Sequence, residues 1–226
     1  MIGLALYRTA TSLGGPLIRL YLGRRRASGK EDPERFGERL GVSTQSRPDG
    51  RLVWMHAASV GEATSLLPLM ARMRQLWPGH AILLTTGTVT SAHVMAERLP
   101  EGAFHQYVPV DRMAYVRRFL NHWRPDLAVW AESEFWPNMV CETARRRIPL
   151  ILVQGRISTR AYAGWRRHHR LIRRLLGAFT LCLGQTEADA ERLRALGAAH
   201  AECRGNLKYA APPLPAPADA LIEMER

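Results

Sequence analysis

Carboxylate and hydroxyl side chains follow the ends of strand-like segments in this 226-residue sequence. The apolar run Leu52–Met55 leads into Ser-Val-Gly-Glu at positions 59–62, and a helical pattern begins at Glu62. Glu132 and Glu134 follow another apolar run in the same way. A carboxylate that is partly buried in a cleft can act as the general base that takes a proton from a sugar hydroxyl. A glutamate in the first turn of a helix can equally be structural, because its charge complements the helix dipole.

The elements that must position these residues alternate between strands and helices. Short apolar runs predict strands at 52–55, 81–84, 104–108, 127–130, 150–153 and 179–183. Helical patterns lie near 62–77, 90–99, 112–123, 137–147, 163–176 and 186–196. Thr186 and Asp189 predict a cap for the last of these helices, and Gly197 predicts its end. Buried strands that alternate with amphipathic helices predict an α/β fold, a Rossmann-like parallel sheet with helices on both faces.

Polar residues after each of the six predicted strands fall at one edge of such a sheet. Open α/β sheets bind ligands outside the carboxyl ends of their strands, so these clusters predict a crevice for a polar ligand. Two alternatives remain open. The hydroxyls of Thr86 and Thr88 suit sugars or phosphates, but threonine equally suits strands and helix caps. Glu132 and Glu134 could face a ligand or pair with arginines such as Arg156.

The composition is strongly basic, with a formal net charge of +12. This charge indicates an anionic partner, namely nucleic acid, a phosphorylated substrate or an acidic membrane, although GC-rich coding would also enrich arginine. Seven arginines and no acids occupy positions 156–174, which suits a phosphate or lipid-headgroup surface, a nucleic-acid patch or a solvated helix face. The three distant cysteines predict reduced thiols and no metal site. The sequence has no GxGxxG motif, P-loop or GxSxG motif, which disfavours a dinucleotide oxidoreductase.

Residues 1–22 are moderately apolar, and three arginines follow at 24–26. Charges and glycines interrupt this stretch, so it predicts an interfacial helix with a basic flank in preference to a membrane span. The alternative is an ordinary amphipathic helix packed on the domain. We expect three parts: a membrane-associating helical segment at 1–45, a Rossmann-like domain at 46–209, and a linker at 210–226 that starts a further domain.

Several uncommon sequence words occur in a consistent order along residues 1–209. They are Trp-Met-His-Ala-Ala-Ser-Val-Gly-Glu at 54–62, Glu-Ser-Glu-Phe-Trp-Pro-Asn at 132–138, Arg-Ile-Ser at 156–158 and Gly-Asn-Leu-Lys at 205–208. Together with 35–37 and 107–111, they resemble the N-terminal half of bacterial 3-deoxy-D-manno-octulosonic acid (Kdo) transferases. The sequence departs from the family pattern at Gln154 and Gly155, where Asn-Ala is usual, and at Phe135, which replaces a common leucine.

The resemblance implies the first domain of a two-domain glycosyltransferase of the GT-B type. Such an enzyme would transfer Kdo from CMP-Kdo to a lipid A precursor in lipopolysaccharide biosynthesis, at the cytoplasmic face of the inner membrane. By the same resemblance, Glu62 is the general base of an inverting reaction, and Glu132 and Lys208 stabilise its transition state. The residues expected to bind the acceptor are Ser59, Gly61, Thr86, Thr88, Glu134, Arg156 and Ser158.

We expect no metal, no other cofactor and no nucleic-acid partner. The CMP-binding domain of the family is expected outside these 226 residues, so the chain alone is expected to be inactive. The alternative hypothesis is a basic α/β domain that binds nucleic acid or a membrane surface without catalysis.

Overall fold

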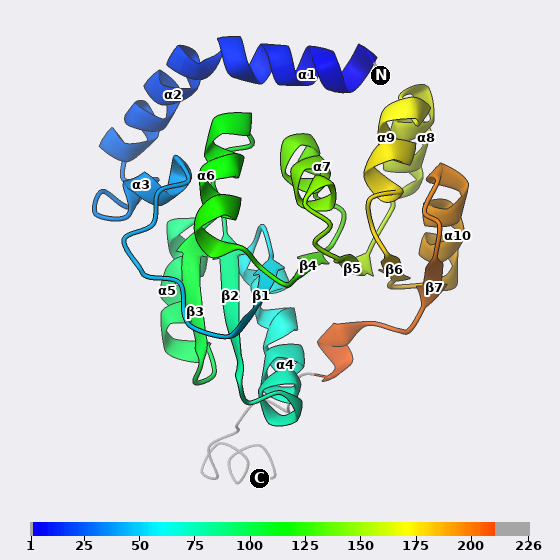
Figure 1. Ribbon diagram of the computed structural model, residues 1–226. Helices are drawn as coiled ribbons and strands as arrows, with labels where there is room; N and C mark the ends of the chain where they lie inside the picture. The colour runs from blue at the N-terminus through cyan, green and yellow to red at the C-terminus, as the bar shows by residue number, and fades with distance from the viewer. Residues whose placement is uncertain (1, 211–226) are drawn as a thin grey trace, which may run out of the picture.

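The computed structural model describes residues 2–210, which are built around a parallel β-sheet (Figure 1). Its seven strands lie in the order β3-β2-β1-β4-β5-β6-β7. Every neighbouring pair is parallel, which confirms the predicted Rossmann-like sheet. The strands are β1 Arg51–His56, β2 His80–Thr86, β3 Ala103–Tyr107, β4 Leu127–Ala131, β5 Leu150–Gly155, β6 Leu181–Gly184 and β7 Ala201–Cys203.

Helices cover both faces of the sheet, because alternate residues of each strand point to opposite faces. Within β1, Leu52 and Trp54 join one hydrophobic core, whereas Val53 and Met55 join the other. Helices α4 and α5 pack on the second core, and α6, α7, α9 and α10 pack on the first. The bounds are α4 Val60–Leu76, α5 Val89–Arg98, α6 Met113–Trp123, α7 Pro137–Arg145, α8 Thr159–Arg167, α9 His169–Leu176 and α10 Glu187–Leu196.

Two N-terminal helices, α1 Ile2–Leu13 and α2 Gly15–Ala27, add a layer outside α6, α7 and α9 (Figure 1). The Tyr7 hydroxyl ties this layer to the domain by donating a hydrogen bond to Asp111 over 2.9 Å. A short helix, α3 Phe36–Arg39, then leads to the sheet. Within residues 2–210, no helix combines the length and apolarity that crossing a bilayer requires.

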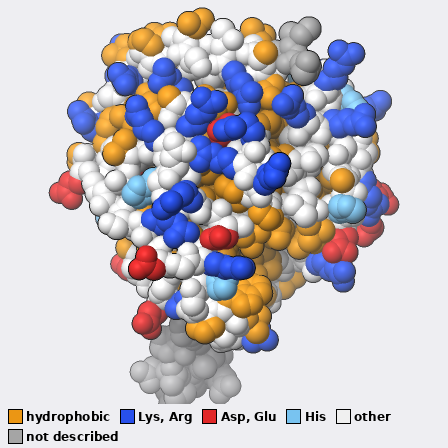
Figure 2. Space-filling model, viewed as in Figure 1, with side chains coloured by type: hydrophobic (Ala, Val, Ile, Leu, Met, Phe, Trp, Pro, Cys, Tyr) orange, Lys and Arg blue, Asp and Glu red, His pale blue; other side chains and the backbone are white. Residues whose placement is uncertain are grey.

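The same two helices leave large apolar side chains on the surface. The exposed side chains are Leu6, Leu13, Leu17, Leu20 and Tyr21. Figure 2 shows hydrophobic patches of this kind between Lys and Arg side chains in the upper part of the molecule, where α1 and α2 lie. The inner side is packed, because Leu4 and Leu22 are buried. Helices α1 and α2 therefore pack on the domain, which agrees with the alternative prediction of an amphipathic helix packed there. They also present an apolar outer side.

The six predicted strands are all present in the structure, but the short helices at Phe36–Arg39 and Leu207–Ala210 were not predicted, and two further differences follow. The strand β7 was missed, because it has only three residues and none of them is buried. The helix predicted at 163–176 is two helices, because His168 leaves the helical conformation with φ −112° and ψ 36°. The predicted cap is confirmed: Thr186 accepts a hydrogen bond from the backbone N–H of Asp189, and Gly197 ends α10 at φ 112°. Residues 211–226 of the predicted linker lie outside the described residues.

Candidate active site

The three carboxylates singled out above follow two strands that lie side by side. Glu62 comes after β1, and Glu132 and Glu134 come after β4. These strands are paired in the sheet, with His56 opposite Trp130 at their carboxyl ends. The order of the sheet reverses between β1 and β4, and α/β sheets bind ligands at such a switch point. Residues about 70 positions apart in the sequence thus meet at the place where a ligand crevice is expected.

Local hydrogen bonds fix the Glu62 carboxylate at the start of α4. Ser59 is the N-cap of this helix, and its hydroxyl accepts a hydrogen bond from the Glu62 backbone N–H. The same hydroxyl donates to Oε1 of Glu62 over 2.8 Å, and the Ala58 backbone N–H donates to Oε2 over 2.8 Å. This arrangement resembles a capping box, except that the backbone N–H bound by the glutamate belongs to Ala58, one residue before the N-cap. Glu62 is 9% exposed, and among the residues that the structure describes no arginine forms an ion pair with it.

Glu132 lies next to a lysine from the far end of the described chain. Its φ of +56° is unusual for a residue with a side chain, and such strain is often found at functional sites. The Lys208 Nζ lies 3.7 Å from Oε1 of Glu132. Lys208 belongs to the short helix η1 Leu207–Ala210, whose Leu207 packs against the core beneath α4. The turn and its apolar contact bring Lys208 to the switch point.

Two residues that the sequence analysis did not assign to the site support this lysine. The side-chain oxygen of Asn206 accepts hydrogen bonds from the Lys208 backbone N–H and from Nε2 of Gln154, over 2.9 and 2.6 Å. Gln154 lies at the end of β5 with φ +58°, so it shares the unusual conformation of Glu132. The departure of Gln154 from the family pattern marked this position in the sequence, but its contact with Asn206 required the folded chain.

Burial and neighbouring charges shift the pKa values of Glu132 and Glu134. Burial raises the pKa of Glu132, and the nearby Glu62 raises it further, whereas Lys208 acts in the opposite direction. Burial also raises the pKa of Glu134, with smaller contributions from Glu62 and Glu132. Carboxylates with raised pKa values in a crevice are candidates for acid–base chemistry. Within residues 2–210 Arg156 forms no ion pair with Glu132 or Glu134, but its charge is near enough to lower the pKa of Glu132, so the alternative of a direct pair is replaced by a weaker electrostatic influence.

The other predicted acceptor-binding residues take several positions. Three hydroxyls are helix caps: Ser59 caps α4, Thr88 caps α5 and Ser158 caps α8. Thr86 is fully buried, and its hydroxyl bonds to His105 and Ser91, which supports a structural role instead of acceptor contact.

The remaining two predicted positions are open to solvent. Gly61 is exposed in the first turn of α4, and a Cβ atom there would meet no atom within 4 Å. Arg156 is exposed, and its backbone N–H donates to Ser133. Both positions leave room for a ligand beside Glu62 and Glu132.

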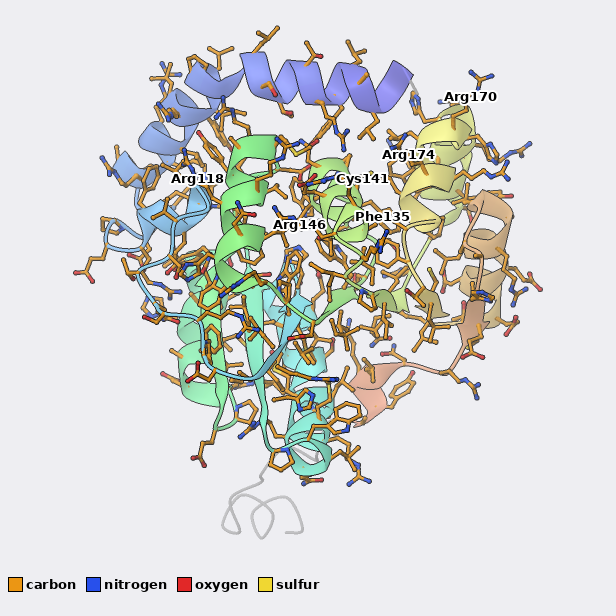
Figure 3. The ribbon with its side chains drawn as sticks, viewed as in Figure 1. Arg118, Phe135, Cys141, Arg146, Arg170 and Arg174 are labelled. Carbon is orange, nitrogen blue, oxygen red and sulfur yellow. The ribbon has the colours of Figure 1, made fainter. Side chains whose placement is uncertain are left out.

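The arginine-rich run at 156–174 forms α8 and α9 beyond this crevice. Figure 3 shows Arg174 on α9 and Cys141 on α7 below α1, and Arg170 at the top of α9 beside the N-terminal end of α1. Arg170 and Arg174 line a surface cavity of about 480 Å³ together with Gly3 and Leu4 of α1. The run therefore lies beside the N-terminal layer. In the part of the chain that the structure describes, no group of three or more His, Cys, Asp or Glu side chains could hold a metal ion.

Comparison with known proteins identifies a family. The family model described as 3-deoxy-D-manno-octulosonic-acid transferase (kdotransferase) matches residues 34–211. A 3-deoxy-D-manno-octulosonic acid transferase of Rickettsia bellii is 33% identical over 87% of this chain and 47% of its own length. A probable mitochondrial 3-deoxy-D-manno-octulosonic acid transferase of Arabidopsis thaliana is 38% identical over 71% of this chain and 36% of its own length. The chain thus spans half or less of these curated relatives.

Solved structures with the same fold are much more distant in sequence. The UDP-GlcNAc 2-epimerase of Neisseria meningitidis bound to UDP-GlcNAc superposes with a TM-score of 0.51 at 11% identity, over 70% of this chain and 47% of that chain. The S. aureus MnaA–UDP structure superposes with a TM-score of 0.53 at 11% identity, over 78% of this chain and 52% of that chain. At this level of identity the likeness shows the fold alone.

Proposed function

The chain belongs to the 3-deoxy-D-manno-octulosonic acid transferase family, and we propose that it forms the acceptor-binding half of a GT-B glycosyltransferase. The proposed reaction transfers Kdo from CMP-Kdo to a lipid A precursor in lipopolysaccharide biosynthesis. The donor would be held by a second domain across the crevice at the carboxyl ends of β1 and β4. Family membership supports the reaction class, and the arrangement of side chains at the switch point supports the assignment of roles below.

In the proposed reaction, an acceptor hydroxyl attacks the anomeric carbon of Kdo. The acceptor oxygen forms a bond to that carbon while the bond from the carbon to the phosphate oxygen of CMP breaks. CMP leaves with the electron pair of the broken bond, and the configuration at the carbon inverts. Glu62 takes the hydroxyl proton as general base. Lys208 and Glu132 lie beside it and would stabilise the charge that develops in the transition state.

One observation carries this proposal, namely the fixed carboxylate of Glu62 at the switch point. Its two oxygens each accept one hydrogen bond from the chain, so the group is oriented before a substrate arrives. Each oxygen retains a second lone pair that can accept a substrate proton. The open space beside Gly61 gives a hydroxyl access from the crevice.

The test is the rate of Kdo transfer from CMP-Kdo to the lipid A precursor, in a protein that joins this chain to a donor domain. Glu62→Gln should abolish most of the turnover, because the amide cannot accept the proton. Full turnover by this variant would refute the assignment of the base.

We further propose that the protein works at the cytoplasmic face of the inner membrane, with α1 and α2 against the lipid. The exposed leucines of these helices form an apolar surface, and Leu13 and Leu17 are 77% and 71% exposed. Arg24, Arg25 and Arg26 follow in the last turn of α2. Apolar side chains next to arginines are typical of interfacial helices that bind anionic lipids.

A further inference from the structure

A cavity of about 450 Å³ lies between α2 and the carboxyl ends of the central strands. Its wall on one side comes from α2, and its floor comes from the end of β1 and from the segments that follow β1, β2, β3 and β4. Ala58 contributes to this floor, and its backbone N–H holds the carboxylate of Glu62. The cavity therefore adjoins the proposed general base, and it includes two of the residues expected to bind the acceptor, Thr88 and Glu134.

The two sides of the cavity differ in polarity. Ile18, Tyr21 and Leu22 line it from one stripe of α2, because residues three and four apart share a helix face. His56, Thr88 and Glu134 are on the polar side. Tyr21 is also 60% exposed, so the apolar wall continues to the surface leucines of α2. A cavity with one apolar and one polar side, open toward an apolar surface, fits an amphiphile with its polar head inside.

His56 lines this cavity and carries a buried polar atom without a partner. The side chain is 1% exposed, packs against Trp130 with ring centroids 4.6 Å apart, and bonds through Nδ1 to the Thr85 hydroxyl over 3.0 Å. Its Nε2 has no hydrogen-bond partner among residues 2–210. Burial lowers the pKa of His56 to about 3, so the ring is neutral and Nε2 offers one donor or one acceptor. Buried polar groups normally have partners, and a bound ligand would provide one here.

Two arginines of the lining offer donors to an anionic group on that head, whereas Glu134 on the polar side would repel one. Arg25 and Arg39 both line the cavity, and both pair with the same carboxylate, Glu31, over 2.6 and 3.2 Å. Two guanidinium groups therefore have one acidic partner between them. Arginine presents several donors in a fixed geometry that matches carboxylate and phosphate oxygens.

We propose that this cavity binds the head of an acylated sugar that carries an anionic group, with Nε2 of His56 hydrogen-bonded to the sugar and an acyl chain along α2. This proposal rests on the proposed function, because the acylated sugar is then the acceptor whose hydroxyl reaches Glu62. It makes His56 a binding residue that selects the acceptor, distinct from the carboxylates that act on it.

The experiment measures binding of the lipid A precursor in detergent micelles to the 226-residue chain by titration calorimetry. His56→Asn keeps an amide near the position of Nδ1 but withdraws the tip from the cavity, and we expect affinity to fall about three- to tenfold. His56→Gln places an amide near Nε2 and should stay within about twofold of the parent protein. His168→Asn, which changes a surface histidine between α8 and α9, is the matched control and should not alter affinity.

A second variant covers the case in which His56→Asn fails to fold, which thermal melting would reveal. Ile18→Trp fills the apolar side from α2 and should remove binding. A precursor without acyl chains should bind at least tenfold more weakly than the acylated form, and micelles alone should produce no heat that depends on His56. Unchanged affinity in His56→Asn and in Ile18→Trp would overturn the proposal.

The outcome separates this proposal from the proposed function. Glu62→Gln should bind the precursor normally, because the variant alters the proton acceptor and leaves the cavity intact. Normal acceptor binding without Kdo transfer in the protein joined to a donor domain would refute the proposed function alone. Kdo transfer that persists while Ile18→Trp fills the cavity would refute the cavity proposal alone.

Discussion

Replacing Glu62 by glutamine separates its two roles, because glutamine also serves in a capping box. The amide oxygen can accept the Ala58 N–H, and the amide nitrogen can donate to the Ser59 hydroxyl. The cap is therefore largely retained, and the unfolding free energy should change by less than about 1 kcal/mol. The proton acceptor is lost, so kcat should fall about 10²- to 10⁴-fold, which corresponds to about 3 to 5 kcal/mol of activation free energy.

Alanine at the same position removes both functions. The two hydrogen bonds to the carboxylate disappear, and the N-terminus of α4 loses its acidic residue. The expected cost is about 1 to 2 kcal/mol of stability, or a melting temperature lower by roughly 2 to 8 °C for a chain of this size. A comparison of Glu62→Gln with Glu62→Ala thus distinguishes loss of catalysis from loss of folding.

Asp189 offers a matched control within the same fold. Its carboxylate accepts the Thr186 hydroxyl over 2.6 Å and the Ile157 backbone N–H over 2.9 Å, as Glu62 accepts Ser59 and Ala58. Asp189→Asn should keep its cap and leave kcat within about twofold. Both variants are assayed for Kdo transfer and for thermal melting. The reasoning is refuted if Glu62→Gln keeps kcat within tenfold of the parent, or if Asp189→Asn loses as much.

Two further predictions concern charge and the membrane. In Lys208→Met, the loss of the cation should raise the pKa of its carboxylate partner, Glu132, further. Because that carboxylate works as an anion, activity should then be lost at a higher pH as the solution is acidified, whereas Lys30→Met should keep the parent pH profile. Replacing Leu17 and Leu20 together by serine should weaken sedimentation with anionic lipid vesicles at least tenfold. Leu76→Ser, which changes a leucine on α4 that is as exposed as Leu20, should bind vesicles normally, and equal losses in both would contradict an interface on α2.

The sequence predicted where the strands and helices lie better than it predicted which strands are paired in the sheet. Apolar runs of four or five residues mark β1 to β6, because buried parallel strands are apolar on both faces. The order of the strands has no local signal, so the pairing of β1 with β4 could not be derived from periodicity. The three-residue strand β7 lacks enough buried positions to form a pattern.

The same distinction applies to the site. Glu62, Glu132 and Glu134 were identified from their places after strands, and the structure brings them within electrostatic influence of one another. The sequence could not decide whether the Ser and Thr hydroxyls cap helices or contact a ligand, because both roles require the same residue types. His56 looked like the last residue of a strand, and only packing shows that its Nε2 is buried without a partner.

The comparison of Glu62 with Asp189 shows why position in the sheet carries the functional argument. Both residues occupy the third position of a helix after an N-cap hydroxyl, both accept one hydroxyl and one backbone N–H, and both are nearly buried, at 9% and 6% exposure. Hydrogen bonding and burial therefore do not tell a structural acid from a base. What differs is the neighbouring strand: β1 adjoins β4, whose end supplies Glu132 and Glu134, whereas Asp189 follows β6 near the edge of the sheet. A capping carboxylate becomes a candidate base where the switch point places other carboxylates and a cation beside it.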